Sequence, residues 1–220
     1  MSAEAALIGV VLVPLLGALA VVLAGSRPNL REAMSLGAGV VLLALVVRLL
    51  PRVLSGDWPA TVLAEPIPGL ALAFSAEPLG VLFGLIASFL WIVTTVYSIG
   101  YMRGHGEAHQ TRFYAFFAIA MGCTMGVAFA DNLFTLFVFY ELLTLSTYPL
   151  VTHAGTREAR QGGRTYLGVL MATSMGFLLL AVVWTWQLTG NVRFTSGGIL
   201  AGAASPLVIG ILFALYVFGI

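Results

Sequence analysis

Glu141 is the residue best placed to do chemistry, because its acidic side chain lies midway along an otherwise uncharged apolar run, Leu133 to Val151. An ionised side chain at the centre of a membrane helix costs roughly 2.5 to 3.5 kcal/mol, so such residues usually face a protein interior and carry protons or ions. A carboxyl group can bind and release a proton as its charged neighbours move. We therefore expect proton or cation transfer at Glu141.

Polar residues extend from Glu141 along one side of the same run. Thr144, Tyr148 and Thr152 follow it by three, seven and eleven places, a spacing that puts all four on nearly one face of a helix. The pattern predicts a proton or cation path that includes Glu141, Thr144 and Tyr148. A structural reading stays open, since Thr often bonds to its own backbone and Tyr is a common packing residue.

Titratable residues lie at both ends of this run. His153 titrates near neutral pH, so it either feeds protons inward from the cytoplasmic side or is a solvated helix-end residue. Asp131 precedes the run together with Asn132. It is either a point where protons enter or, as we favour, the cap of the following helix.

Other motifs point away from a metal or cofactor. His105 and His109 are four residues apart with Glu107 between them, but Gly104 and Gly106 disfavour the helix that a metal site of this spacing needs. We interpret this stretch as a solvated loop. The sequence has no glycine-rich phosphate loop, nucleophile elbow, CxxC pair or haem attachment motif, and we assign no metal and no cofactor.

The composition is that of an integral membrane protein. Of 220 residues, 60% are hydrophobic and 9% are charged, whereas soluble domains average about 25% charged residues. The net charge of +1 argues against a nucleic-acid partner, and all ten basic residues are Arg. The lipid bilayer is therefore the expected surrounding, and the chain has no Lys.

Long apolar runs predict an all-α, polytopic bundle of transmembrane helices. A seventh run, Pro206 to Ile220, reaches only about 22 Å as a helix, short of the roughly 30 Å hydrocarbon core, so we expect a truncated seventh span and a fragment of a longer protein. Between the second and third runs, the alternation at Leu70 to Phe74 allows a short strand or hairpin on the outer face. The six full spans are expected at residues 5–24, 33–50, 79–99, 113–130, 133–151 and 165–186.

The arginines predict the orientation, because positive residues stay cytoplasmic when loops are short. Seven arginines fall in the loops after spans one, three and five, and three fall on the opposite side. The N-terminus should therefore lie outside a multi-pass protein of the cell (inner) membrane. The seven are Arg27, Arg31, Arg103, Arg112, Arg157, Arg160 and Arg164; the three are Arg48, Arg52 and Arg193.

Three stretches resemble a known family. DNLFTLFVFYELLTLSTYPLV, from Asp131 to Val151, resembles the fifth-helix signature of the proton-translocating antiporter-like family. EPLGVLFGLIASFLWIVTTVYSIGYM, from Glu77 to Met102, and RFYAFFAIAMGCTMGVAFA, from Arg112 to Ala130, also match. The family includes large subunits of Mrp-type cation/proton antiporters, antiporter-like subunits of respiratory complex I, and subunits of membrane-bound hydrogenases.

The resemblance implies a role for Glu141 as the family's essential glutamate, whose partner is a seventh-helix lysine that this sequence does not contain. It implies transport of protons, with Na⁺ or K⁺ as exchanged cations, and other membrane subunits as partners. It also implies a single transmembrane domain over 1–220, in which 113–220 begins the first of two inverted repeats.

Within the family, the signature looks closest to the D-type large subunit of the Mrp antiporters. The alternatives are a proton-pumping subunit of a complex I-like NADH-quinone oxidoreductase or a hydrogenase, and a structural or assembly subunit. Redox catalysis would then belong to partner subunits, so we lean towards a transporter subunit that is not itself an enzyme.

Overall fold

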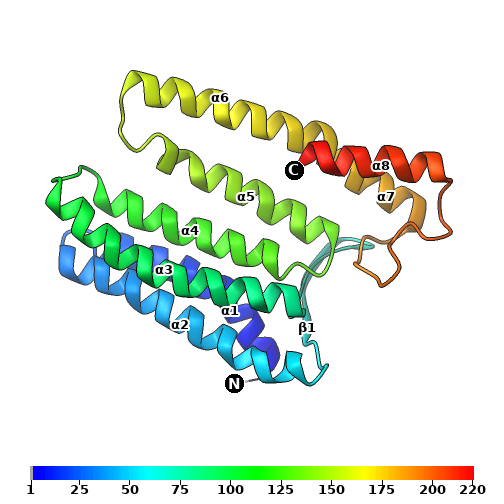
Figure 1. Ribbon diagram of the computed structural model, residues 1–220, viewed down its shortest axis with the longest axis horizontal. Coiled ribbons are helices and arrows are strands. Elements are labelled where there is room, and N and C mark those ends of the chain that lie inside the picture. The colour runs from blue at the N-terminus through cyan, green and yellow to red at the C-terminus, as the bar shows by residue number, and fades with distance from the viewer. Residues whose placement is uncertain (1) are drawn as a thin grey trace.

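Long apolar helices dominate the computed structural model, which describes residues 2–220 (Figure 1). Six of its helices are long and apolar enough to cross a membrane, which confirms the predicted polytopic helical fold. The helices are α1 (Ala3–Leu23), α2 (Pro28–Leu54), α3 (Pro78–Gly104), α4 (Gln110–Ala128), α5 (Leu133–Val151), α6 (Arg157–Thr173), α7 (Leu179–Thr189) and α8 (Pro206–Gly219). A π-helical segment, η1 (Ser174–Leu178), joins α6 to α7 in one rod, Arg157–Thr189.

Capping residues explain where these helices begin. Proline occupies the first turn of α2, α3 and α8, where its missing N–H costs no helical hydrogen bond. The side chains of Ser2, Asn132, Thr156 and Ser205 accept hydrogen bonds from first-turn amides of α1, α5, α6 and α8. The predicted bounds of α5 are confirmed, whereas α2 and α6 begin several residues earlier than expected.

The segment between α2 and α3 forms an antiparallel hairpin, as its alternation allowed. Its strands are β1 (Ala60–Ile67) and β2 (Leu70–Ser75). Gly69 has a φ of 82° in the connecting turn, a conformation that favours glycine. The Thr135 side chain, in the first turn of α5, accepts from Ala73 N at 2.9 Å and donates to Ala71 O at 3.1 Å. The hairpin therefore docks on the start of α5.

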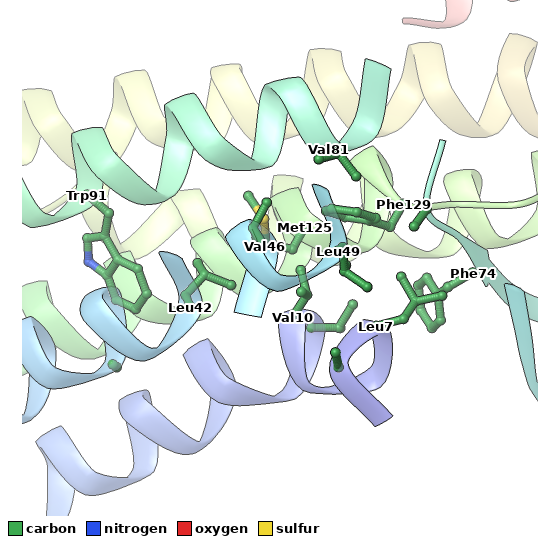
Figure 2. Packing of buried hydrophobic residues seen from close by; sticks show 14 of the residues in the cluster. Leu7, Val10, Leu42, Val46, Leu49, Phe74, Val81, Trp91, Met125 and Phe129 are labelled. Carbon is green, nitrogen blue, oxygen red and sulfur yellow. The ribbon is translucent and has the colours of Figure 1, made fainter. Parts of the chain in front are cut away.

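The helices α1 to α4 share one apolar core (Figure 2). Leu7, Leu42 and Met125 come from three of these helices and are fully buried. Phe74 of β2 is also fully buried and closes the core at the hairpin. The core thus fixes α4, the helix against which α5 packs.

The turns after α1, α3 and α5 lie at one end of the bundle and the hairpin lies at the other (Figure 1). We call these the arginine end, at residues 24–27, 105–109 and 152–156, and the hairpin end. Gly126 of α4 lies against Phe139 of α5, where an added Cβ would be 2.0 Å from the ring. This close contact fixes which face of α5 meets α4.

Candidate functional site

Glu141 lies in the middle of α5 with its side chain inside the protein. The residue is 7% exposed, and within residues 2–220 neither carboxylate oxygen has a hydrogen-bond partner. Most buried polar groups in proteins are hydrogen-bonded, so an unpaired buried carboxylate needs an explanation such as water, an ion or a further partner. Thr173 and Ser174 of the neighbouring rod donate to carbonyls of their own helix.

The face of α5 that carries Glu141 meets the rod formed by α6, η1 and α7. Phe137, one turn before Glu141, packs in a cluster with Leu178 and Val182. Tyr148, two turns after it, lies against Gly163 of α6, where an added Cβ would be 3.3 Å from the ring. Residues 137, 141 and 148 share one side of a helix, so Glu141 faces the stretch of the rod between Gly163 and Leu178.

The polar residues that follow Glu141 on one face of α5, namely Thr144, Tyr148 and Thr152, differ in burial and in their hydrogen bonds. Thr144 is buried and lies on the same face as Glu141. Tyr148 is half-buried against α6, and Thr152 donates to the Tyr148 carbonyl at 2.9 Å. The structure therefore brings Thr144, Tyr148 and Thr152 to the α5–α6 side with Glu141, although the Thr152 hydroxyl bonds to its own helix while its methyl group lies against Gly163.

A polar contact that the sequence did not suggest joins α5 to α6 beside these residues. Thr147 Oγ1 lies 3.1 Å from the Tyr166 hydroxyl, and Thr147 also donates to the Thr144 carbonyl at 2.9 Å. Tyr166 therefore adds a hydroxyl to the side of the interface that Glu141 faces.

The rod opposite Glu141 is not a regular α-helix. At η1 it forms a π-helical turn that includes the fully buried Ser174, and such bulges are frequent at functional sites. The C-terminal end of α8 packs here too, because a Cβ on Gly219 would be 2.5 Å from the backbone of Leu178. Tyr140, next to Glu141, donates its hydroxyl to the Ile220 carbonyl at 3.1 Å.

Asp131 does not cap α5, so the favoured prediction was wrong. The cap is Asn132, whose Oδ1 accepts from Thr135 N at 2.8 Å. Asp131 instead forms an ion pair with Arg193, at 2.9 Å between Oδ2 and Nε. It lies ten residues before Glu141, about 15 Å along the helix, at the hairpin end.

His153 lies beyond α5 at the arginine end, twelve residues from Glu141, or about 18 Å along the helix. Its half-buried ring packs edge-on against Phe113 with centroids 5.7 Å apart, and its carbonyl accepts from Arg112 Nη2 at 3.0 Å. Burial lowers the pKa of His153, and the Arg112 charge lowers it further, with smaller opposing effects of Glu107 and the Ala108 backbone. Its neutral form is therefore favoured.

A second buried carboxylate, Glu32, escaped the sequence analysis. It is 4% exposed and accepts from Arg103 Nε at 3.0 Å and from Arg31 Nη2 at 3.4 Å. Arg31 is also buried, donates to Gln110 at 2.7 Å and lies over the Tyr114 ring at 5.3 Å. The charged pair Arg31–Glu32, just before the apolar run that starts at residue 33, was the only signal of this cluster, which ties α2, α3 and α4 together at the arginine end.

Comparisons with known proteins show what this chain is similar to. The family described as NADH:quinone oxidoreductase/Mrp antiporter, TM, matches residues 130–219, which include α5 and Glu141. NADH-quinone oxidoreductase subunit N from Desulforudis audaxviator is 29% identical over 206 residues, 91% of this chain and 40% of the relative. The chain is therefore similar to the proton-translocating antiporter-like family, by the family match over residues 130–219 and by a relative aligned along most of its length.

An antiporter subunit and a solved antiporter complex are also similar to this chain. Na⁺/H⁺ antiporter subunit A1 from Staphylococcus aureus is 28% identical over 125 residues, 56% of this chain and 15% of the relative. Among solved structures, the Mrp complex from Dietzia sp. DQ12-45-1b matches with a TM-score of 0.80 and 24% identity over 100% of this chain and 40% of that one. The closer likeness to the D-type antiporter subunit stays a prediction.

The membrane-bound sulfane sulfur reductase, an archaeal respiratory membrane complex, shares the fold of this chain. It matches with a TM-score of 0.79 and 20% identity over 99% of this chain and 44% of that one. The chain thus spans about two fifths of the length of NADH-quinone oxidoreductase subunit N and of these structures. Its six helices that are long and apolar enough to cross a membrane make it a multi-pass membrane chain.

Proposed function

We propose that the chain is the part of an ion-translocating subunit that carries one protonatable group of a mid-membrane path, in a multisubunit cation/proton antiporter. The observation that carries this proposal is Glu141, whose two oxygens are buried without a hydrogen-bond partner among the described residues. A carboxylate held in this way is sensitive to any charge or water that reaches it. Its protonation can therefore follow the movement of a neighbouring charge.

The proposed path follows the α5–α6 interface. Glu141 and Thr144 are buried on the face that meets the rod, Tyr148 continues it towards the arginine end, and His153 lies at that end. Protons are the proposed cargo, with Na⁺ or K⁺ as the cations exchanged. Asp131, held by Arg193 at the hairpin end, is the candidate point where protons enter from the other side.

A second function is supported by the relative that covers most of this chain. NADH-quinone oxidoreductase subunit N matches 91% of the chain, so the same path could belong to a redox-driven pump of the complex I or hydrogenase type. Electron transfer would then take place on partner subunits and drive protons past Glu141.

Further proposals concern the surroundings of the path. They are a cell (inner) membrane location with the N-terminus outside, other membrane subunits as partners, and residues 113–220 as the start of the first inverted repeat within one transmembrane domain. The arginine end, with its seven arginines in the three turns and the adjacent helix ends, supports the orientation.

The test is Glu141→Gln in the full-length protein within its complex, measured as proton flux in sealed vesicles. The amide keeps the size of the side chain and removes the proton that titrates, so we expect flux to be lost while a native gel still shows the whole complex. Glu158→Gln, at an exposed acid of the first turn of α6, is the matched control and should leave flux unchanged.

The same vesicles separate the candidate functions. Flux driven by an imposed Na⁺ or K⁺ gradient supports the antiporter, and flux that requires an electron donor supports the redox-driven pump. Unchanged flux in Glu141→Gln would remove both. Loss of the complex itself from the gel would leave Glu141 as a residue of assembly.

A further inference from the structure

An open surface cavity of about 700 Å³ lies at the arginine end, away from Glu141. It is formed by the turn after α1, the start of α2, the end of α3 and the start of α4. No acidic side chain lines it within the described part of the chain. The lining residues are Ser26, Arg27, Pro28, Asn29, Arg103 and Gln110.

The cavity carries excess positive charge. Of its two arginines, Arg103 is paired with Glu32, but that single buried carboxylate also pairs with Arg31. Arg27 forms no ion pair with any acid of residues 2–220. The α2 helix begins at Pro28, so the positive end of its dipole adds to the guanidinium charge at this point.

The polar walls of the cavity are held in place by contacts of their own. Arg103 Nη2 donates to Asn29 Oδ1, which links the end of α3 to the start of α2. Gln110 donates to the carbonyls of Met102 and Glu107, both at 3.1 Å, and accepts from Arg31. Arg103, Asn29 and Gln110 are therefore held by contacts with the fold, and the exposed Arg27 lies beside them.

Apolar surface runs from this cavity towards the middle of the helices. On α3, Val96 lies seven residues before Arg103 and is 58% exposed. On α2, Val40 lies eleven residues after Asn29 and is 54% exposed. These spacings put Val96 on the same face of α3 as Arg103, and Val40 on the same face of α2 as Asn29, each further from the arginine end. Tyr101, 44% exposed near the end of α3, suits the headgroup level of a membrane.

We propose that this cavity binds the phosphate of an anionic phospholipid, whose acyl chains lie along the exposed face of α2 and α3. Guanidinium groups match phosphate geometry and bind it with charge-assisted hydrogen bonds. Basic pockets between membrane helices on the cytoplasmic side are a recognised way to hold anionic headgroups. The adjoining apolar surface favours a lipid over a soluble phosphate, because a soluble phosphate has no acyl chain to pack on that surface.

The test uses the full-length chain in nanodiscs with equal parts of phosphatidylglycerol and phosphatidylcholine, with retained lipid counted by native mass spectrometry. We expect the wild type to retain phosphatidylglycerol selectively. Arg27→Gln should reduce this retention about fivefold, the effect of about 1 kcal/mol per arginine near a membrane surface. Arg160→Gln, at an exposed arginine at the same end, should have no effect.

A second variant covers the case in which Arg27→Gln fails to fold. Asn29→Asp keeps the side-chain size and the oxygen that Arg103 contacts, and it places a negative charge in the cavity, so it should also reduce retention. Equal retention of both lipids by the wild type, or unchanged selectivity in the folded variants, would overturn the proposal. Saturable binding of inorganic phosphate in ³¹P NMR, lost in Arg27→Gln without any lipid preference, would assign the cavity to a soluble anion instead.

Discussion

The Tyr166 hydroxyl of α6 lies 3.1 Å from Thr147 Oγ1 of α5, and this contact is the polar link between the two helices beside the Glu141 face. Removing either hydroxyl should weaken the interface by about 0.6 kcal/mol, the average for hydrogen bonds between membrane helices. Tyr166→Phe and Thr147→Val should therefore each destabilise the full-length protein slightly, as measured by thermal unfolding in detergent.

The double variant tests whether the two hydroxyls act on each other. If they do, Tyr166→Phe with Thr147→Val costs less than the sum of the single changes. Strict additivity would mean that the contact contributes nothing to stability. Thr165→Val is a suitable control, because its hydroxyl donates to Gln161 of its own helix at 3.2 Å.

Close packing of α3 on α4 gives a prediction with a control in the same helix. An added Cβ at Gly80 would be 2.4 Å from the Ala128 carbonyl oxygen, a backbone atom, whereas Gly100 has nothing within 4 Å. Gly80→Ala should force the helices apart and destabilise the protein by roughly 1–3 kcal/mol. Gly100→Ala should be neutral or stabilising, because Ala favours the helix more than Gly does.

Chemical denaturation of the full-length protein in detergent would compare the two glycine variants. Equal stability of Gly80→Ala and the wild type would show that α3 and α4 can separate there without loss. A large loss in Gly100→Ala would point to a partner subunit packed on that exposed glycine.

Features that depend on one continuous segment of the sequence could be predicted. Glu141 was identified because a single acid inside an apolar run is visible without any partner, and α5 could be bounded because the polar pair Asp131 and Asn132 precedes the run. Glu32 could not be identified in this way. Its burial depends on Arg103, 71 residues further along, and next to Arg31 it has the appearance of an ordinary solvated helix start.

Choices between neighbouring residues also needed the fold. Asp131 and Asn132 are both good caps, and Arg193, 62 residues away, draws Asp131 into an ion pair and leaves Asn132 to cap. The residue types of Ser174–Leu178 do not predict the π-helical turn that this segment forms. It coincides with the place where α8 packs against Leu178, and that packing is tertiary.

The neutral state of His153 predicts how stability depends on pH. Burial and the Arg112 charge lower its pKa in the folded protein below the usual value of about 6.5. The unfolded chain then binds more protons than the folded one between these two pKa values, so stability rises with pH across that window. Below the lowered pKa the ring is charged in the folded protein, and the full cost of burying that charge reduces the free energy of unfolding. Above about 6.5, the usual pKa, the ring is neutral in both states and this cost is absent.

Thermal unfolding of the full-length protein across this range should show the effect, and His153→Gln should flatten it. The groups that face the ring, Arg112, Glu107 and His109, remain in the variant, so the difference between the two curves isolates His153. A His153→Gln curve parallel to the wild type would show that His153 titrates alike in the folded and unfolded chains, because only a difference between its two pKa values can produce a slope.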